Sequence, residues 1–232
     1  MDLAPKLEIA SEESSVTAWP ATTAVTARDL HAVDANVVVR RAIFDHIEVI
    51  RNLADQQLEI EAVAKAMVRS ITAGGKIIWC GNGGSAADSQ HLAAELVGRF
   101  RRERRGLASI ALTTDTSILT AVGNDYGYDQ VFRRQIEALC LSVDAVVGIS
   151  TSGNSRNVCK ALQAARAIGA ATIAMTGRNR GELGTSADLA ICADAEDTAR
   201  IQETHILVGH ILCDWIETSV CARKSISDLE LR

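Results

Sequence analysis

The chain has 232 residues, of which 47% are hydrophobic and only 3% aromatic, and its formal net charge at pH 7 is −5. This apolar content excludes a wholly disordered chain and predicts a core of aliphatic side chains on helices and a sheet. The negative charge gives no general attraction for polyanions, and no run of about 18 apolar residues occurs. We therefore expect no nucleic-acid partner and no membrane partner.

The N-terminal segment, residues 1–33, contains both prolines and shows no sustained hydrophobic periodicity. This predicts a poorly ordered extension that takes no part in the fold. Acidic residues stand where a signal peptide needs a basic region and an apolar run, so we expect a cytoplasmic protein. One domain is predicted over residues 34–224, followed by a C-terminal tail over residues 225–232.

Two kinds of hydrophobic pattern follow in chain order. From residue 35 to about residue 73, helical spacing predicts one long N-terminal helix or two consecutive ones, ended by Gly74 and Gly75. A last helical pattern covers residue 198 to about residue 222. Between them, five short apolar runs predict buried strands at residues 76–80, 107–112, 145–149, 171–175 and 188–191. Most runs are followed by a loop and a helix, which predicts an α/β fold with a doubly wound, mainly parallel sheet flanked by helices.

The loops after the first and third strands are candidates for ligand binding, because ligands of a doubly wound sheet bind beyond the carboxyl ends of its strands. Residues 81–85 read GNGGS and residues 150–155 read STSGNS, and each loop precedes a predicted helix. Glycine amides, helix N-termini and several hydroxyl groups together favour binding of a phosphate monoester. The same residue types are also ordinary turn and N-cap residues, which is the structural alternative for either loop.

A dinucleotide site is another alternative for the first loop, because Gly81, Gly83 and Ala86 fit the pattern G-x-G-x-x-G/A. That pattern also needs an acidic residue about 20 positions later, at the end of the next strand. Glu103 precedes this strand, and Asp115 follows it later than the pattern expects. NAD binding therefore ranks below phosphate binding.

Candidate metal ligands and proton carriers lie on two predicted helices. His91 and Glu95 are four residues apart, so their side chains share one helix face. Such a pair has three alternative roles: ligands of a divalent metal, a general base, or a simple surface pair. His210 lies in an apolar stretch, where a lone histidine is often a core residue. Gln202 and His210 are eight residues apart, which separates their backbones by about 12 Å. If both serve one site, it lies between them or at a subunit contact, which favours an oligomer.

Two further polar segments are candidates for contact with a sugar. Asn124 and Asp125 are predicted to lie in a loop after a short helix. The two alternatives for them are contact with sugar hydroxyl groups and a simple turn. The arginines of residues 99–105 predict a solvated loop, with Arg99 at the edge of a site.

Four segments match, in order and spacing, the motifs of one known family: GNGGSAADSQHLAAEL, ALTTDTSILTAVGNDYGYD, ISTSGNSRNV and ARIQETHILVGHILCDWIE. From about residue 35 to residue 222 the sequence resembles the phosphoheptose isomerases, a branch of the sugar isomerase (SIS) fold. The resemblance implies a five-stranded parallel sheet and an aldose-ketose isomerase that converts sedoheptulose 7-phosphate to D-glycero-D-manno-heptose 7-phosphate through an enediolate, for the heptose of lipopolysaccharide. It also implies a homotetramer with the site at a subunit interface and one zinc ion per subunit.

The matching motifs imply roles for individual residues. Those that would hold zinc are His91, Glu95, Gln202 and His210. Those that would contact substrate are Asn82, Gly83, Gly84, Ser85, Glu95, Asn124, Asp125, Ser150, Thr151, Ser152, Ser155 and Gln202. The hydroxyl groups of the second loop would hold the phosphate of the substrate. For catalysis, we hypothesise that Glu95 is the base at carbon and that His210 is the acid and base at oxygen.

A competing resemblance is to a non-catalytic SIS protein that binds the replication initiator DnaA. That protein is similar in the phosphate loops, but by resemblance it lacks the glutamate and the second histidine of the isomerases. Both residues are present here, as Glu95 and His210, which favours the enzyme.

Overall fold

The computed structural model describes residues 35–230, with side chains up to residue 222. The predicted extension of residues 1–33 lies outside this described part. The chain divides into two units, residues 1–40 and 41–232. Of the first unit, the structure describes the opening residues of helix α1 (Ala35–Leu53), where Arg40 Nε donates a hydrogen bond to Asn36 Oδ1 at 2.8 Å. The second unit contains the sheet and the remaining helices.

Five parallel strands form the sheet, in the order β2-β1-β3-β4-β5. They are β1 (Ile77–Gly81), β2 (Ser109–Ala111), β3 (Ala145–Ser150), β4 (Ala171–Gly177) and β5 (Leu189–Ala193). Each of the five predicted apolar runs overlaps one strand, and the predicted doubly wound parallel sheet is confirmed. The runs are apolar throughout because helices bury both faces of the sheet.

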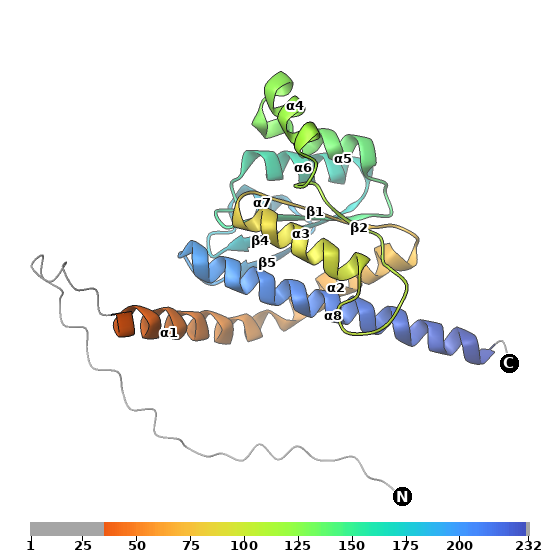
Figure 1. Cartoon of the computed structure of the whole chain (residues 1–232), viewed down its shortest axis with the longest axis horizontal. Coiled ribbons are helices and arrows are strands. Elements are labelled where there is room, and N and C mark those ends of the chain that lie inside the picture. Colours follow the sequence, from red (N-terminus) through yellow and green to blue (C-terminus); the bar gives the residue numbers. More distant parts are fainter. Residues whose placement is uncertain (1–34, 231–232) are drawn as a thin grey trace, which may run out of the picture. The chain divides into compact units, whose positions relative to one another are not determined.

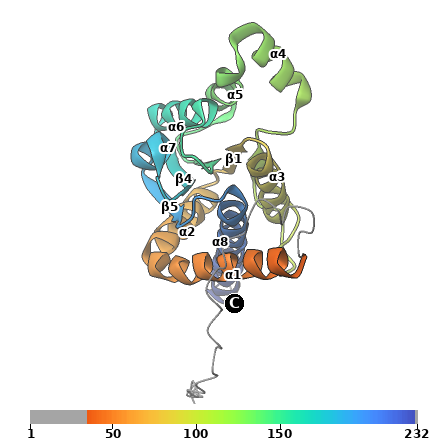
Figure 2. The same cartoon turned by 90° about the vertical axis from the view of Figure 1, so that its left-hand side faces the viewer.

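Side chains along β1 alternate between those two faces. Ile77 and Trp79 pack in the core under α2, α3 and α8, whereas Ile78 and Cys80 pack in the core under α5 and α6. Figures 1 and 2 show these two helical layers on either side of the strands. All four side chains are fully buried, so a polar substitution at any of them would place an unpaired group in the core.

The N-terminal helical pattern forms two helices, because the turn η1 (Ala54–Gln56) separates α1 from α2 (Gln57–Thr72). Helix α2 stops just before the Gly74-Gly75 pair, as predicted. The following helical elements are α3 (Gly84–Val97), α4 (Thr116–Tyr126), η2 (Tyr128–Gln130), α5 (Arg133–Leu139), α6 (Arg156–Ile168), α7 (Gly181–Ser186) and α8 (Thr198–Glu230).

Helix α8 is longer than the sequence pattern predicts. It runs through Glu230, past the predicted end near residue 222 and into the predicted tail of residues 225–232. Residues 222–230 contain neither glycine nor proline, so nothing interrupts the helical hydrogen bonds there. None of the helices in the described part is both long enough and apolar enough to span a membrane.

The strand order brings the two predicted ligand loops together. The chain continues from β1 to β2 on one side of β1, whereas β3 lies on the other side, so the strand order reverses between β1 and β3. The two strands pair up to their ends, where Gly81 is opposite Ile149. The loops that follow them therefore flank one crevice at the carboxyl edge of the sheet.

Candidate active site

The first loop connects β1 to α3 through Asn82 and Gly83, and Gly84 opens the helix. The first N–H groups of a helix have no partner inside it, so those at the start of α3 are available to an anion. The Ser85 side chain is 3% exposed and packs close to the Gly81 backbone. We therefore expect Ser85 to contact a ligand through its backbone amide and not through its hydroxyl group.

Gly84 lies directly against the side chain of Gln202 from α8. A Cβ atom at position 84 would come within 2.3 Å of Gln202 Nε2, so the close approach requires glycine. Seven residues of α3 separate Gly84 from His91, a rise of about 10 Å. In the single chain, the Gln202 amide thus lies at the end of α3 nearest the first loop, about two helical turns from His91. The ligand role implied for Gln202 stays a prediction.

The second loop gathers hydroxyl groups at the start of α6. Ser150 Oγ lies 2.9 Å from Ser155 Oγ and 3.5 Å from Ser152 Oγ. The Gly153 amide donates to the Ser150 carbonyl at 3.0 Å, which closes the turn, and Ser155 stands at the N-cap of α6 without a side-chain capping bond. Its hydroxyl is therefore free of the usual structural task of an N-cap serine. This arrangement supports the phosphate-binding alternative over the simple turn.

Two asparagines link the first loop to the second. Asn82 Nδ2 donates to Asn157 Oδ1 at 2.9 Å, and Asn157 Nδ2 donates back to Asn82 Oδ1 at 2.8 Å. The Tyr128 hydroxyl also donates to Asn82 Oδ1, at 3.4 Å. Sequence reasoning missed Asn157, although its place in the first turn of α6, just after the hydroxyl loop, was a usable signal. The reciprocal amide pair fixes the Asn82 side chain at the crevice.

His91 and Glu95 of α3 meet His210 of α8. One ligand atom from each residue lies within 4.8 Å of the other two. His91 Nε2 is 2.9 Å from His210 Nε2 and 3.4 Å from Glu95 Oε1. The helical spacing of His91 and Glu95 thus produces a shared site, and His210 completes it from a helix that begins more than a hundred residues later in the chain.

The surroundings of His210 favour its neutral form. Its ring stacks on Phe100, with centroids 5.4 Å apart and planes at 25°, and meets the His91 ring edge-on at 5.1 Å. Burial lowers the pKa of His210, His91 and Arg101 lower it further, and Glu95 opposes them. His210 is only partly buried, and the core histidine of α8 is His205, which is 1% exposed. A neutral imidazole is the form that binds a metal or accepts a proton.

Asp88 is another residue that sequence reasoning missed. It precedes His91 by three positions on α3, so the two side chains share a helix face. Its Oδ2 atom is buried and has no hydrogen-bond partner among the described residues. Burial raises the pKa of this carboxyl, and the charge of His91 opposes that rise. A buried, unpaired carboxylate oxygen next to His91 fits a site that receives a cation or a hydroxyl group.

Asn124 and Asp125 lie in the last turn of α4, and the loop predicted for them is wrong. The helix includes both residues and ends after Tyr126, at Gly127, whose φ of +90° favours glycine. Both side chains are exposed, and Asn124 Nδ2 donates to Asp125 Oδ1 at 2.8 Å. Within residues 35–230 neither side chain hydrogen-bonds to either ligand loop. Figure 2 shows α4 standing out from the rest of the helical layer.

The donor set of the His91 cluster fits zinc. Two imidazoles and one carboxylate are a common protein ligand set for this metal in catalytic sites, which keep a further position for water or substrate. Chemically, the site offers a carboxylate and an imidazole that can accept and return protons, on helices of which α3 begins at the first ligand loop.

The acidic residues needed for the dinucleotide alternative are used elsewhere. The Glu103 side chain is 88% exposed and lies 3.7 Å from Arg99 Nε. Asp115 caps α4, because its Oδ1 accepts a hydrogen bond from the Ile118 amide at 2.9 Å. Both carboxylates thus serve their own loop or helix, which removes the support for a ribose-binding acid.

Comparison with known proteins identifies close relatives. A family model described as "SIS domain" matches residues 44–177. The chain is 54% identical over 165 residues to a phosphoheptose isomerase of Aquifex aeolicus, an alignment that covers 71% of this chain and 86% of that protein. A solved phosphoheptose isomerase of Neisseria gonorrhoeae has a TM-score of 0.75 and 43% identity, covering 79% of this chain and 98% of that one.

A second solved relative agrees with the first. A phosphoheptose isomerase of Francisella tularensis has a TM-score of 0.77 and 35% identity, and it covers 80% of this chain and 100% of that one. These relatives give no support to the non-catalytic alternative of a DnaA-binding protein. The family match over residues 44–177 spans strands β1 to β4, both ligand loops and helix α3, which carries His91 and Glu95.

Proposed function

The chain belongs to the phosphoheptose isomerase family of SIS-domain enzymes, and we propose that it converts sedoheptulose 7-phosphate to D-glycero-D-manno-heptose 7-phosphate. The observation that carries the proposal is the convergence of His91, Glu95 and His210 within 4.8 Å, with the first two on the helix that starts at the first ligand loop and His210 on α8. The product would supply heptose for lipopolysaccharide, in the cytoplasm as the sequence predicts.

We place the substrate phosphate in the second loop. The Ser150 hydroxyl lies 2.9 Å from that of Ser155 and 3.5 Å from that of Ser152, and the N-terminus of α6 adds a favourable dipole. Thr151 adds a fourth hydroxyl group to this loop. Residues 150–155 themselves contain no lysine or arginine, so this loop would bind the phosphate through neutral hydroxyl and amide donors.

The sugar chain would run from this cradle past the first loop. The Asn82 amide, held by Asn157, and the Gln202 amide, held against Gly84, are placed to bind hydroxyl groups along the way. This pose leaves C1 and C2 of the sugar at the His91 cluster.

The reaction moves one proton between carbons and one between oxygens. Glu95 accepts a proton from C1 of the ketose, which gives the enediolate, and returns it to C2. His210, neutral because of its burial, accepts the proton of the C1 hydroxyl and delivers it to the oxygen on C2. Both residues end in their starting protonation states, so the cycle is balanced.

His91, Glu95 and His210 would hold a zinc ion. Gln202, the fourth ligand that the family resemblance implies, lies about two helical turns from His91 in the single chain, so it would join the site only across a subunit contact. When bound, zinc would polarise the sugar oxygens and stabilise the negative charge of the enediolate. Glu95 would then serve both as ligand and as base, and its contact with His91 through Oε1 keeps the carboxylate close to the reacting carbons.

An oligomer with the site at a subunit interface, a homotetramer in the family resemblance, is part of the proposal. Ile43, Phe44 and Ile47 of α1 are 40–55% exposed in the single chain, and so are Ile211 and Trp215 of α8 at 37–39%. Apolar side chains repeated along two helix faces are typical of a surface that another subunit covers. The exposed positions of Asn124 and Asp125 also fit a substrate contact that needs a second chain.

The proposal is tested with purified protein and sedoheptulose 7-phosphate. Metal is removed with a chelator, zinc is returned, and the aldose product is followed by NMR. We expect product only after zinc is returned, and about one zinc per chain. A protein that binds zinc but leaves the substrate unchanged would overturn the assigned reaction. A protein that is active without any metal would overturn the zinc site and keep the isomerase.

A further inference from the structure

Glu217 is a charged side chain in the interior, two turns beyond His210 on α8, and its side chain is fully buried. Its Oε1 accepts a hydrogen bond from the Phe100 amide at 3.0 Å. Its Oε2 accepts from the amides of Arg101 and Arg102, both at 2.8 Å. Burial opposes ionisation, but these three N–H donors and Arg104 hold the pKa of Glu217 below its usual range. One carboxylate thus fixes three consecutive backbone amides.

Arg104 is the charged partner of Glu217, and its side chain is only 5% exposed. Its Nε atom lies 3.0 Å from Glu217 Oε1. The other end of the guanidinium group caps α3: it donates to the carbonyl oxygens of Glu95 at 3.0 Å, Leu96 at 2.9 Å and Gly98 at 3.1 Å. A buried arginine at these carbonyls fixes the last turn of α3, which carries Glu95.

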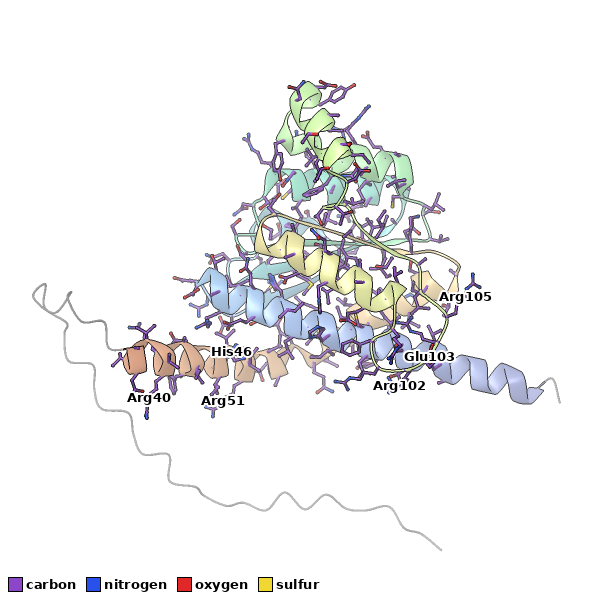
Figure 3. The ribbon with its side chains drawn as sticks, in the orientation of Figure 1. Arg40, His46, Arg51, Arg102, Glu103 and Arg105 are labelled. Carbon is purple, nitrogen blue, oxygen red and sulfur yellow. The ribbon has the colours of Figure 1, made fainter. Side chains whose placement is uncertain are left out.

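Residues 98–106, the arginine loop, also reach the site directly through Phe100. The Phe100 ring stacks on the His210 ring, and the Arg101 guanidinium lies 5.1 Å from the centre of the same Phe100 ring. Arg101 and Arg102 both pair with Asp214 on α8, at 3.3 Å and 2.8 Å. Figure 3 shows Arg102 beside α8, whereas Arg105 points away from it. The loop is solvated, as predicted, because Arg99, Arg101, Arg102 and Arg105 are exposed, and it is also anchored to α8.

We propose that Arg104 and Glu217 form a positioning pair that sets the distance between Glu95 and His210. The inference deepens the function proposed above and rests on it. Arg104 holds the backbone of Glu95, Glu217 holds the backbone of Phe100, and Phe100 holds the ring of His210. The two groups that move protons are thereby connected through one buried ion pair, whose two residues are not members of the His91 cluster.

The chemistry of the pair favours this role over simple stabilisation. Removing two charges from water largely offsets their attraction, and an apolar pair of similar volume is often as stable. The carboxylate, however, accepts directional hydrogen bonds from the arginine loop, and the guanidinium donates others to α3. Together these bonds are specific for a single arrangement of α3, the arginine loop and α8. Apolar packing tolerates small shifts of the helices, whereas these bonds do not.

The test uses the full chain loaded with zinc and three variants: Arg104→Lys, Glu217→Gln and Phe100→Leu. Lysine keeps the charge of residue 104 but lacks the fork that reaches the α3 carbonyls. Arg133 and Glu137 form an exposed ion pair on α5, at 2.8 Å, so Arg133→Lys and Glu137→Gln are matched controls. Folding of every variant is checked by circular dichroism at the assay temperature.

We expect zinc affinity, measured by competition with a chelating dye, to fall about tenfold or more in the three variants, as for other outer contacts of metal ligands. We expect kcat to fall about 100-fold, as for a misplacement of about 1 Å, with KM nearly unchanged because the phosphate cradle is intact. The controls should match wild type in both quantities. Folded variants with wild-type zinc affinity and kcat, but a lower melting temperature, would overturn the proposal and leave a structural pair.

Failure of the proposed function is distinguishable from failure of the pair. Zinc affinity needs no sugar substrate, so a tenfold loss in the variants supports the positioning role even if wild type does not isomerise the heptose. If Glu217→Gln does not fold, Phe100→Leu decides, because leucine keeps apolar volume and removes only the ring that stacks on His210. A Phe100→Leu protein with normal zinc affinity and normal kcat would overturn the proposal.

Discussion

His91 Nε2 and His210 Nε2 lie 2.9 Å apart, although 119 residues separate the two histidines in the chain. Helices α3 and α8 run side by side in the same direction, because Gly84 packs on Gln202 and Leu92 packs on Gly209. A Cβ atom at position 209 would come within 2.5 Å of the Leu92 side chain, so glycine allows the close approach. The two imidazoles meet as a result of this helix packing.

Glu95→Gln should abolish most of the activity. Glutamine keeps the shape of the side chain and removes its basicity, so we expect kcat to fall about 10²- to 10⁴-fold with the phosphate contacts intact. Product formation from sedoheptulose 7-phosphate measures the change, and Glu137→Gln on α5 is the control for loss of a carboxylate. Normal turnover in Glu95→Gln would show that another residue is the base at carbon.

His91→Ala should lose the metal. Zinc bound by the purified protein, measured by atomic absorption, should drop from about one per chain to well below that value, because one of two imidazole ligands is gone. His46→Ala is the matched control, since His46 lies on α1 and pairs with Glu203, with Nδ1 2.7 Å from Oε2. Equal zinc contents in the two variants would argue that the metal binds elsewhere.

Ser152→Ala and Ser155→Ala should weaken substrate binding. A hydrogen bond to a charged group contributes about 1.5 to 3 kcal/mol, so KM should rise roughly 10- to 100-fold in each variant, with a smaller effect on kcat. Ser142→Ala, at an exposed position before β3, is the control. Unchanged Michaelis constants would contradict a phosphate cradle in the second loop.

Asn157→Asp should disturb the first loop without removing any substrate contact. Aspartate accepts hydrogen bonds but cannot donate to Asn82 Oδ1, so the reciprocal amide pair is lost while the volume is kept. We expect a rise in KM of about tenfold, from the one unmade bond that positioned Asn82. A variant with the wild-type KM would show that Asn82 is positioned by other contacts.

Stability should fall in mild acid because of His205. This residue is buried against β4, where its Nε2 donates to the Thr176 carbonyl at 3.1 Å, and burial lowers its pKa from 6.5 to about 4. The unfolded chain therefore binds a proton below about pH 6.5, whereas the folded protein does so only below about pH 4. The stabilisation is complete above pH 6.5 and is lost as the pH falls.

Between pH 8 and pH 5, His205 should lower the free energy of unfolding by about 2 kcal/mol. Urea unfolding at the two pH values measures it. His205→Gln keeps an N–H donor for the Thr176 carbonyl and removes the titration, so its stability should depend less on pH by that amount. Identical pH dependence in the variant and in wild type would contradict the assignment.

Much of the fold was predictable because the signals for it are local. Buried parallel strands produce short apolar runs, and each of the five runs overlaps a strand. No apolar run by itself predicts the order of the strands in the sheet. The alternation of strands and helices predicted only that the sheet is doubly wound. The error at Asn124 and Asp125 has a local cause as well: polar residues next to Gly127 resemble a turn, and they also fit the last turn of a helix.

The sequence by itself determined the elements, the two ligand loops and the shared helix face of His91 and Glu95, because hydrogen bonding and burial within an element repeat at short range. The family motifs implied that His210 joins them, but only the tertiary structure shows that contact, the packing of Gln202 against Gly84, and the ion pair between Glu217 and Arg104. These contacts depend on how α3 and α8 pack side by side on one face of the sheet. That packing is set by the fit of side chains far apart in the chain, which no local pattern records.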